Sequence, residues 1–232
     1  MHDKLTWFNP NIEFMFHANI VEYDMNAMSV SISEKYELLD KDTIELLKLL
    51  PKEQRTRKVG LIQRDNKEYS ERLISCELET RRKFIEANKL SEDNVISLHS
   101  DACIFNSRKE IINDIEGIKF KHASTWVGYM RFNGVEIFYT EDGALEFKGV
   151  PKDMINAHTL GLNLYLANIF KKIEDYDDDI IEYMSTFEDK YMRDKLPYNY
   201  YTPFGRRGEY KMSNMKFFGF LANVVLNEMK GW

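Results

Sequence analysis

Helical and extended patterns of apolar residues alternate along the first part of the chain. An apolar run that begins at Ala18 predicts a strand, and it leads to Asp24, where the pattern becomes helical. Apolar residues then recur at helical spacing through 70–88, which predicts a long central helix. The run at 95–105 is almost wholly apolar, so it predicts a strand that is covered on both faces in the centre of a sheet.

Turn signals and then helical spacing follow in the second part of the chain. Residues 117–149 alternate between apolar and polar positions, and Asn133-Gly134 and Asp142-Gly143 interrupt them as turn signals. We therefore expect β-hairpins in this stretch. After Pro151 the apolar spacing is helical to the end of the chain. The three helices that this spacing predicts cover 152–173, 177–193 and 213–230.

The order of these elements predicts an α+β protein. We expect a domain at 1–150, in which helices back an antiparallel sheet, and a helical subdomain at 151–232. The joint between them is expected near residue 150, because the strand pattern changes to a helical pattern at that point.

Composition places the chain among ordinary folded proteins. Of its 232 residues, 44% are hydrophobic and 30% are charged, as in many globular domains. No window approaches the roughly 18 apolar residues that a membrane span needs, so we expect no membrane partner. The two cysteines, Cys76 and Cys103, fall in a helical and an extended run. We expect buried thiols in a reducing compartment and no zinc site.

Charge is distributed unevenly along the chain. The net charge of −6 is not what a simple nucleic-acid-binding module shows. However, residues 52–58 are basic, and acids gather at 174–179. Because a local basic surface decides phosphate binding more than the total charge does, the net charge does not exclude binding to nucleic acid.

Two acids in the apolar runs are candidates for a shared metal site. Asp24 ends the first run, and Asp101 lies in the run 95–105. Nucleotidyl transfer uses two divalent cations roughly 3.5–4 Å apart, which carboxylates on rigid neighbouring elements bridge. Each acid alone also fits a simpler interpretation, because Asp24 could cap a helix and Asp101 could occupy a hairpin turn.

The residues around the two acids are more specific than their spacing. Residues 24–32, Asp-Met-Asn-Ala-Met-Ser-Val-Ser-Ile, resemble the first palm motif of family B DNA polymerases, Asp-Phe-Asn-Ser-Leu-Tyr-Pro-Ser-Ile. The positions that agree are Asp24, Asn26, Ser31 and Ile32. His99-Ser100-Asp101-Ala102 is similar to the second acidic motif of that family, Asp-Thr-Asp-Ser, in a strand–turn–strand setting. The hairpins and helices that follow this second motif resemble the remaining palm strands and the thumb. The resemblance therefore covers residues 18–195.

The resemblance implies a minimal palm and thumb that add nucleotides to a 3′-hydroxyl. Asp24 and Asp101 would be catalytic and would bind Mg²⁺ or Mn²⁺, with a nucleoside triphosphate and a primer–template as partners. Ser29 stands where the family has an aromatic residue that blocks a 2′-hydroxyl, so ribonucleotides are expected substrates. His99 replaces the first acid of the second motif, which counts against ordinary two-metal activity. The sequence lacks the family's fingers motif, so a second chain that supplies fingers is a further expected partner.

Other residues are the candidates for contacts with phosphate and nucleic acid. Arg55, Arg57 and Lys58 would hold the triphosphate, on the grounds of position and charge, although a solvated face with paired Glu53 is the simpler alternative. Aromatic and cationic side chains interleave in 198–207, as in single-strand binders, and a packed loop of a small helical domain fits equally. The expected nucleic-acid contacts are Lys148, Tyr200, Tyr201, Arg206 and Arg207.

Two further functions stay open beside the polymerase. A catalytically degenerate palm-derived subunit would bind nucleic acid or a replication partner, and His99, Ser29 and the missing fingers favour it. An unrelated α+β interaction protein would match the motifs by chance. The resemblance to short, divergent polymerases also implies a phage or mobile-element origin and, for a phage protein, the cytoplasm of the bacterial host.

Overall fold

The computed structural model describes residues 4–132, 134–149, 160–197 and 215–231. The chain forms two compact units, of which the first comprises Met1–Pro10 with Asn19–Thr125 and the second comprises Asn11–Ala18 with Trp126–Trp232. The architecture is α+β with two antiparallel sheets, as the sequence predicts. The expected joint at residue 150 lies outside the described residues, and the domain division at that point stays a prediction.

The first unit is built on a six-stranded sheet with the order β1-β4-β5-β3-β7-β6. Its strands are β1 (Thr6–Phe8), β3 (Ile20–Met25), β4 (Val95–His99), β5 (Ala102–Asn106), β6 (Asp114–Ile115) and β7 (Ile118–Trp126). The apolar run 95–105 therefore forms two strands, where its pattern predicts one and the resemblance to the second acidic motif implies a strand, a turn and a strand. Ser100, with a φ of 43°, lies in the turn between them. The pattern misses this turn because the flanking apolar residues can be buried either in one strand or in a hairpin.

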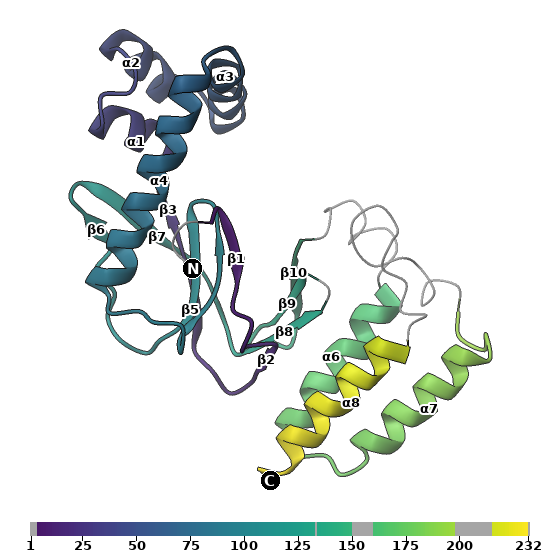
Figure 1. Ribbon diagram of the computed structural model, residues 1–232. Coiled ribbons are helices and arrows are strands. Elements are labelled where there is room, and N and C mark those ends of the chain that lie inside the picture. The colour runs from purple at the N-terminus through teal and green to yellow at the C-terminus, as the bar shows by residue number, and fades with distance from the viewer. Residues whose placement is uncertain (1–3, 133, 150–159, 198–214, 232) are drawn as a thin grey trace. The chain divides into compact units, whose positions relative to one another are not determined.

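Four helices complete the first unit. They are α1 (Met28–Lys35), α2 (Lys41–Leu49), α3 (Lys52–Asp65) and α4 (Lys67–Ala87). The shorter helices α1, α2 and α3 gather around the N-terminal part of α4 (Figure 1). Asn66 caps α4, because its side-chain oxygen accepts a hydrogen bond of 3.0 Å from the amide of Tyr69. The basic run 52–58 is the first half of α3.

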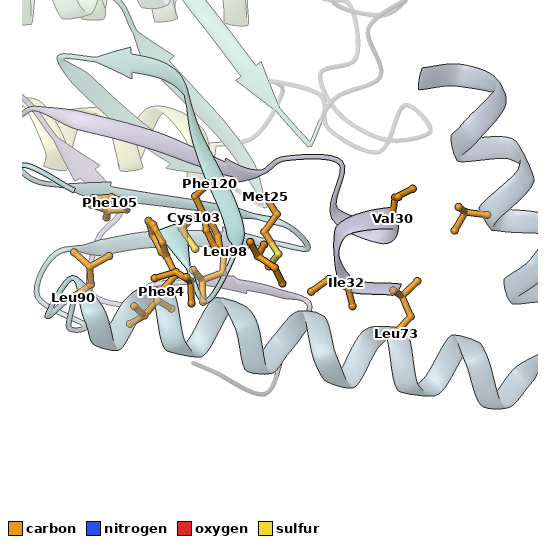
Figure 2. Packing of buried hydrophobic residues seen from close by; sticks show 14 of the residues in the cluster. Met25, Val30, Ile32, Leu73, Phe84, Leu90, Leu98, Cys103, Phe105 and Phe120 are labelled. Carbon is orange, nitrogen blue, oxygen red and sulfur yellow. The ribbon is translucent and has the colours of Figure 1, made fainter. Parts of the chain in front are cut away.

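Apolar side chains from α4 and the strands form the core of the first unit (Figure 2). The ring of Phe84 on α4 stacks on Phe120 of β7 with 4.1 Å between centroids. Leu98, Cys103 and Phe105 of β4 and β5 are fully buried in the same cluster. Burial of each large apolar side chain contributes about 1.5–3 kcal/mol. This core fixes α4 against the strands that carry the candidate acids.

The second unit combines a four-stranded sheet with three described helices. The sheet has the order β10-β9-β8-β2, and its core is shared with the helices. Tyr139 of the sheet stacks on Phe170 of the first helix at 4.9 Å. The elements are β2 (Phe14–Met15), β8 (Gly128–Phe132), β9 (Val135–Tyr139), β10 (Leu145–Lys148), α6 (Leu160–Glu174), α7 (Ile180–Met192) and α8 (Met215–Met229).

The hairpins of the second unit follow the turn signals of the sequence. Phe132 of β8 pairs with Val135 of β9, so a two-residue connection joins the strands, and Gly134 has a φ of 77° that glycine adopts without strain. The connection from β9 to β10 contains Gly143, with a φ of 84°. No helix within the described ranges is long and apolar enough to cross a membrane.

Candidate metal and nucleotide site

The two candidate acids lie at the same end of two neighbouring strands. Asp24 of β3 is paired with Ala102, the first residue of β5, and Asp101 directly precedes that residue. The amide of Met25 donates a hydrogen bond of 3.0 Å to the carbonyl oxygen of Asp101. Because β3 and β5 are hydrogen-bonded neighbours in one sheet, the two carboxylates are held on a rigid frame.

A cavity of about 270 Å³ opens at this end of the sheet. Its wall is made by the end of β3, the turn that carries Asp101, one residue of β7 and the first turns of α1 and α3. Both candidate acids line it. The charged or polar residues of the wall are Asp24, Asn26, Ser29, Lys52, Arg55, Thr56, Asp101 and Lys121.

Helix α3 contributes one face to the cavity. Lys52, Arg55, Thr56 and Val59 line the wall, and their spacing of three or four residues places them on one side of the helix. Arg55 thus joins the acids, as expected, together with Ser29 of α1. Arg57 and Lys58 are exposed and are not part of this wall, so their contact with a triphosphate stays a prediction.

Two cationic wall residues were not expected from the sequence. Lys52 is the first residue of α3, and Lys121 is an exposed residue of β7 that follows the buried Phe120. Alternation along β7 marks Lys121 as outward-facing. Nothing in that pattern indicates which neighbour it meets, so only the paired strands reveal its place beside the acids.

The electrostatics of the cavity combine two acids of like charge with nearby cations. Burial, followed by the negative charge of Asp24, raises the pKa of the Asp101 carboxyl above its ordinary value, and the charges of Lys52 and Lys121 oppose the rise. The neighbouring Cys103 thiol is fully buried, and burial raises its pKa to about 12. Two carboxylates that repel each other are stabilised by a cation between them, whereas this thiol stays protonated and unreactive.

The donor set of the cavity fits Mg²⁺ or Mn²⁺. These hard cations bind oxygen, and Mg²⁺ is held by one or two carboxylates plus substrate phosphates more often than by a cage of protein ligands. Asp24 and Asp101 are such a pair. Among the residues that the structure describes, no group of three or more His, Cys, Asp or Glu side chains is placed to hold a metal ion.

Two helix N-termini line the cavity. Helix α1 begins at Met28 after Ala27, which has a left-handed φ of 48°, and α3 begins at Lys52 after Pro51. The first turns of both helices line the cavity. The backbone amides at a helix start carry partial positive charge and bind phosphate well. The cavity therefore offers carboxylates for a cation and positive groups for an anion.

Two further residues that match the first palm motif stabilise the local fold. The hydroxyl of Ser31 donates a hydrogen bond of 2.8 Å to the carbonyl oxygen of Asn26, which holds the bend between β3 and α1. Ile32 is fully buried in the core. Agreement at these two positions therefore reports on local fold.

The remaining residues of interest lie outside the cavity wall or outside the described residues. The ring of His99 packs edge-on against Phe8, with 5.5 Å between centroids, and His99 is not part of the wall. Lys148 belongs to the second unit, where its ammonium group lies 5.7 Å from the ring centroid of Trp126. The other expected nucleic-acid contacts, Tyr200, Tyr201, Arg206 and Arg207, lie outside the described residues.

Comparison with known proteins places the chain in a phage protein family. The family model described as "Bacteriophage PBS1 gene 130 protein" matches residues 1–231. The chain therefore belongs to this family, and its expected link to phage is confirmed at that level. A search of curated proteins found no match. The description of the family names no activity.

Proposed function

We propose that the protein is a nucleotidyltransferase of the family B polymerase type, which adds nucleotides to a 3′-hydroxyl with Mg²⁺ or Mn²⁺. The observation that carries this proposal is the meeting of Asp24 and Asp101 in one cavity whose other charged residues are cations. A carboxylate pair attracts a divalent cation, and the cationic wall attracts an anion. A metal-bound triphosphate satisfies both halves of the cavity.

Each part of the wall has a place in this proposal. Lys52, Arg55 and Lys121 would hold the triphosphate, together with the backbone amides that begin α1 and α3. Asp24 and Asp101 would hold the divalent cation, which supplies charge neutralisation for the phosphates and activation of the attacking hydroxyl.

The substrate proposal includes ribonucleotides. Ser29 lines the cavity in the first turn of α1, at the motif position that is aromatic in family B polymerases. Its side chain is far smaller than an aromatic ring, which supports acceptance of a 2′-hydroxyl. A primer–template is the proposed second substrate, and a second chain that supplies fingers is a proposed partner.

A catalytically degenerate subunit is the second candidate function. The observation that favours it is the place of His99, which packs against Phe8 outside the cavity wall. The motif position that carries the first acid in family B polymerases therefore adds no carboxylate here. Such a subunit would bind nucleic acid or a replication partner through its basic surfaces and would transfer no nucleotide.

Primer extension tests the first candidate. The purified protein is given a labelled primer–template, Mg²⁺ or Mn²⁺, and either deoxyribonucleotides or ribonucleotides. We expect extension that Asp24→Asn reduces by at least about 100-fold, because one carboxylate no longer binds the cation. Asp42→Asn is the matched control, since Asp42 is exposed on α2 and does not line the cavity.

Binding measurements separate the two candidates. If the protein binds neither cation and Asp24→Asn changes nothing, the nucleotidyltransferase proposal is wrong. Binding of a primed template at low salt that weakens as salt rises, without extension, would favour the degenerate subunit instead.

A further inference from the structure

The turn that carries Asp101 has a backbone conformation that its surroundings must hold. Ser100 has a φ of 43°, in the left-handed region that residues other than glycine adopt at a cost. Its amide donates a hydrogen bond of 2.7 Å to the carbonyl oxygen of Leu5. A conformation of this kind persists only where neighbouring groups stabilise it.

An acid on α4 lies beneath this turn. Glu77 shares one face of α4 with the core residues Leu73 and Phe84, and only 3% of its surface is exposed. Its carboxylate accepts a hydrogen bond of 2.7 Å from the hydroxyl of Ser100. Burial raises the pKa of Glu77, and the charge of Asp101 raises it further. A buried acid is costly at a core position, so a purely structural helix face would carry an apolar residue there.

Arg81, one helical turn after Glu77, binds the backbone of the same serine. Its guanidinium is fully buried and donates hydrogen bonds to the carbonyl oxygens of Ser100 at 2.8 Å and Leu5 at 3.0 Å. It also donates to the carbonyl oxygen of Lys4. The hydroxyl and the carbonyl of Ser100 are thus bound by two charged residues of α4.

We propose that Glu77 is a positioning residue for the candidate site, which fixes the turn through Ser100 so that the Asp101 carboxylate is presented beside Asp24. The role of Asp101 as a metal ligand rests on the proposed function. The claim that Glu77 keeps the turn ordered does not. Neither Glu77 nor Ser100 belongs to the cavity wall. Glu77 acts on the site only through the turn.

Hydrogen–deuterium exchange without metal tests the turn itself. In Ser100→Ala and in Glu77→Leu, we expect the amides of Ser100 and Met25 to exchange about tenfold faster, because the lost hydrogen bond involves a charged group. The amides within β4 and β5 should exchange as in the wild type. Glu77→Gln should restore slow exchange, since its side-chain oxygen still accepts the hydrogen bond from Ser100.

Ser107→Ala is the matched control for Ser100→Ala. Ser107 follows β5 at its opposite end and is also half-buried, so the same chemical change there should leave the two amides unaffected.

Electron paramagnetic resonance of Mn²⁺ gives the second measurement. We expect the dissociation constant to rise about tenfold in Ser100→Ala and to stay near the wild-type value in Glu77→Gln.

Unchanged exchange at Ser100 and Met25 in both disruptive variants would overturn the proposal. Faster exchange throughout the first unit would also overturn it, because Glu77 would then support the fold as a whole. A wild-type protein that binds no Mn²⁺ contradicts the proposed function but leaves the exchange result to decide the positioning part.

Discussion

The two ends of the β3–β5 strand pair differ in how their polar groups are satisfied. At one end the amide of Asn19 donates to the side-chain oxygen of Asn106 at 3.1 Å, and the amide of Ser107 donates to the carbonyl oxygen of Asn19 at 3.0 Å. At the other end, Asp24 and Asp101 face one cavity with like charges. We call the first end the closed end, because its polar groups hydrogen-bond to each other. We call the second end the open end, because its two acids are still able to bind a ligand.

This difference separates stability from function along one pair of strands. Neutral groups that bond to each other lower the free energy of the fold without calling for a ligand. Like charges held together raise that free energy, and a bound cation lowers it again. The following changes test this contrast, from the largest expected effect to the smallest.

Arg81→Met should have the largest effect on stability. It removes the donor to the carbonyl oxygens of Ser100, Leu5 and Lys4, and we expect a loss of about 3–5 kcal/mol in the free energy of unfolding. Arg82→Met is the matched control, because Arg82 makes surface ion pairs with Glu79 and Glu86, which solvent screens and which therefore contribute little to stability. Urea unfolding measures both. Equal losses of unfolding free energy would show that the hydrogen bonds from Arg81 to the backbone of the turn contribute no more than surface ion pairs.

Asn19→Ala tests the closed end. Its side-chain amide donates to the carbonyl oxygen of Ser107, and the loss of that donor should cost about 1–3 kcal/mol of unfolding free energy. Binding of Mn²⁺ should not change. A weaker affinity for Mn²⁺ in this variant would show that the two ends are coupled, and the contrast between them would fail.

Asp24→Asn tests the open end, and we expect effects opposite to those of Asn19→Ala. With one of two like charges removed, we expect a gain of roughly 0.5–1 kcal/mol in unfolding free energy, a fall in the pKa of Asp101 towards its ordinary value, and loss of Mn²⁺ binding. Thermal unfolding checks the gain in stability, and a Mn²⁺ titration checks the loss of binding. A destabilised variant would mean that Asp24 is a structural acid.

Glu77→Gln has the smallest expected effect, and it depends on pH. Burial raises the pKa of Glu77 above its ordinary value of 4.5, so its contribution to stability is fully present below that value and is lost as pH rises through the raised pKa. The stability of the wild type relative to Glu77→Gln should therefore fall as pH rises. Denaturant midpoints at a series of pH values measure this trend.

Glu116→Gln is the control with the opposite sign. Hydrogen bonds from Lys35 and then Lys83 lower the pKa of the exposed Glu116 to about 2. Its contribution is present above the ordinary value of 4.5 and is lost as pH falls towards 2. A common trend for the two variants would contradict the assignment of a costly buried charge to Glu77.

Hydrophobic periodicity was enough to predict much of the fold. The helix around 70–88, the strand that leads to Asp24 and the hairpins of 128–148 all follow local patterns of burial. The pattern placed no helix at 52–65 and saw one strand in 95–105. In both places the residues fit more than one conformation, and contacts with distant segments decide between them.

The sequence by itself determined the apolar runs, the turn signals and the motif that marks Asp24 and Asp101. Tertiary structure alone decided that Lys52 and Lys121 face these acids and that Glu77 supports the turn that carries Asp101. The physical reason is that burial periodicity is a property of neighbouring residues, whereas a cavity is made by segments that only folding brings together. The sequence could therefore name the acid pair, but only the packed sheet and helices could provide its surroundings.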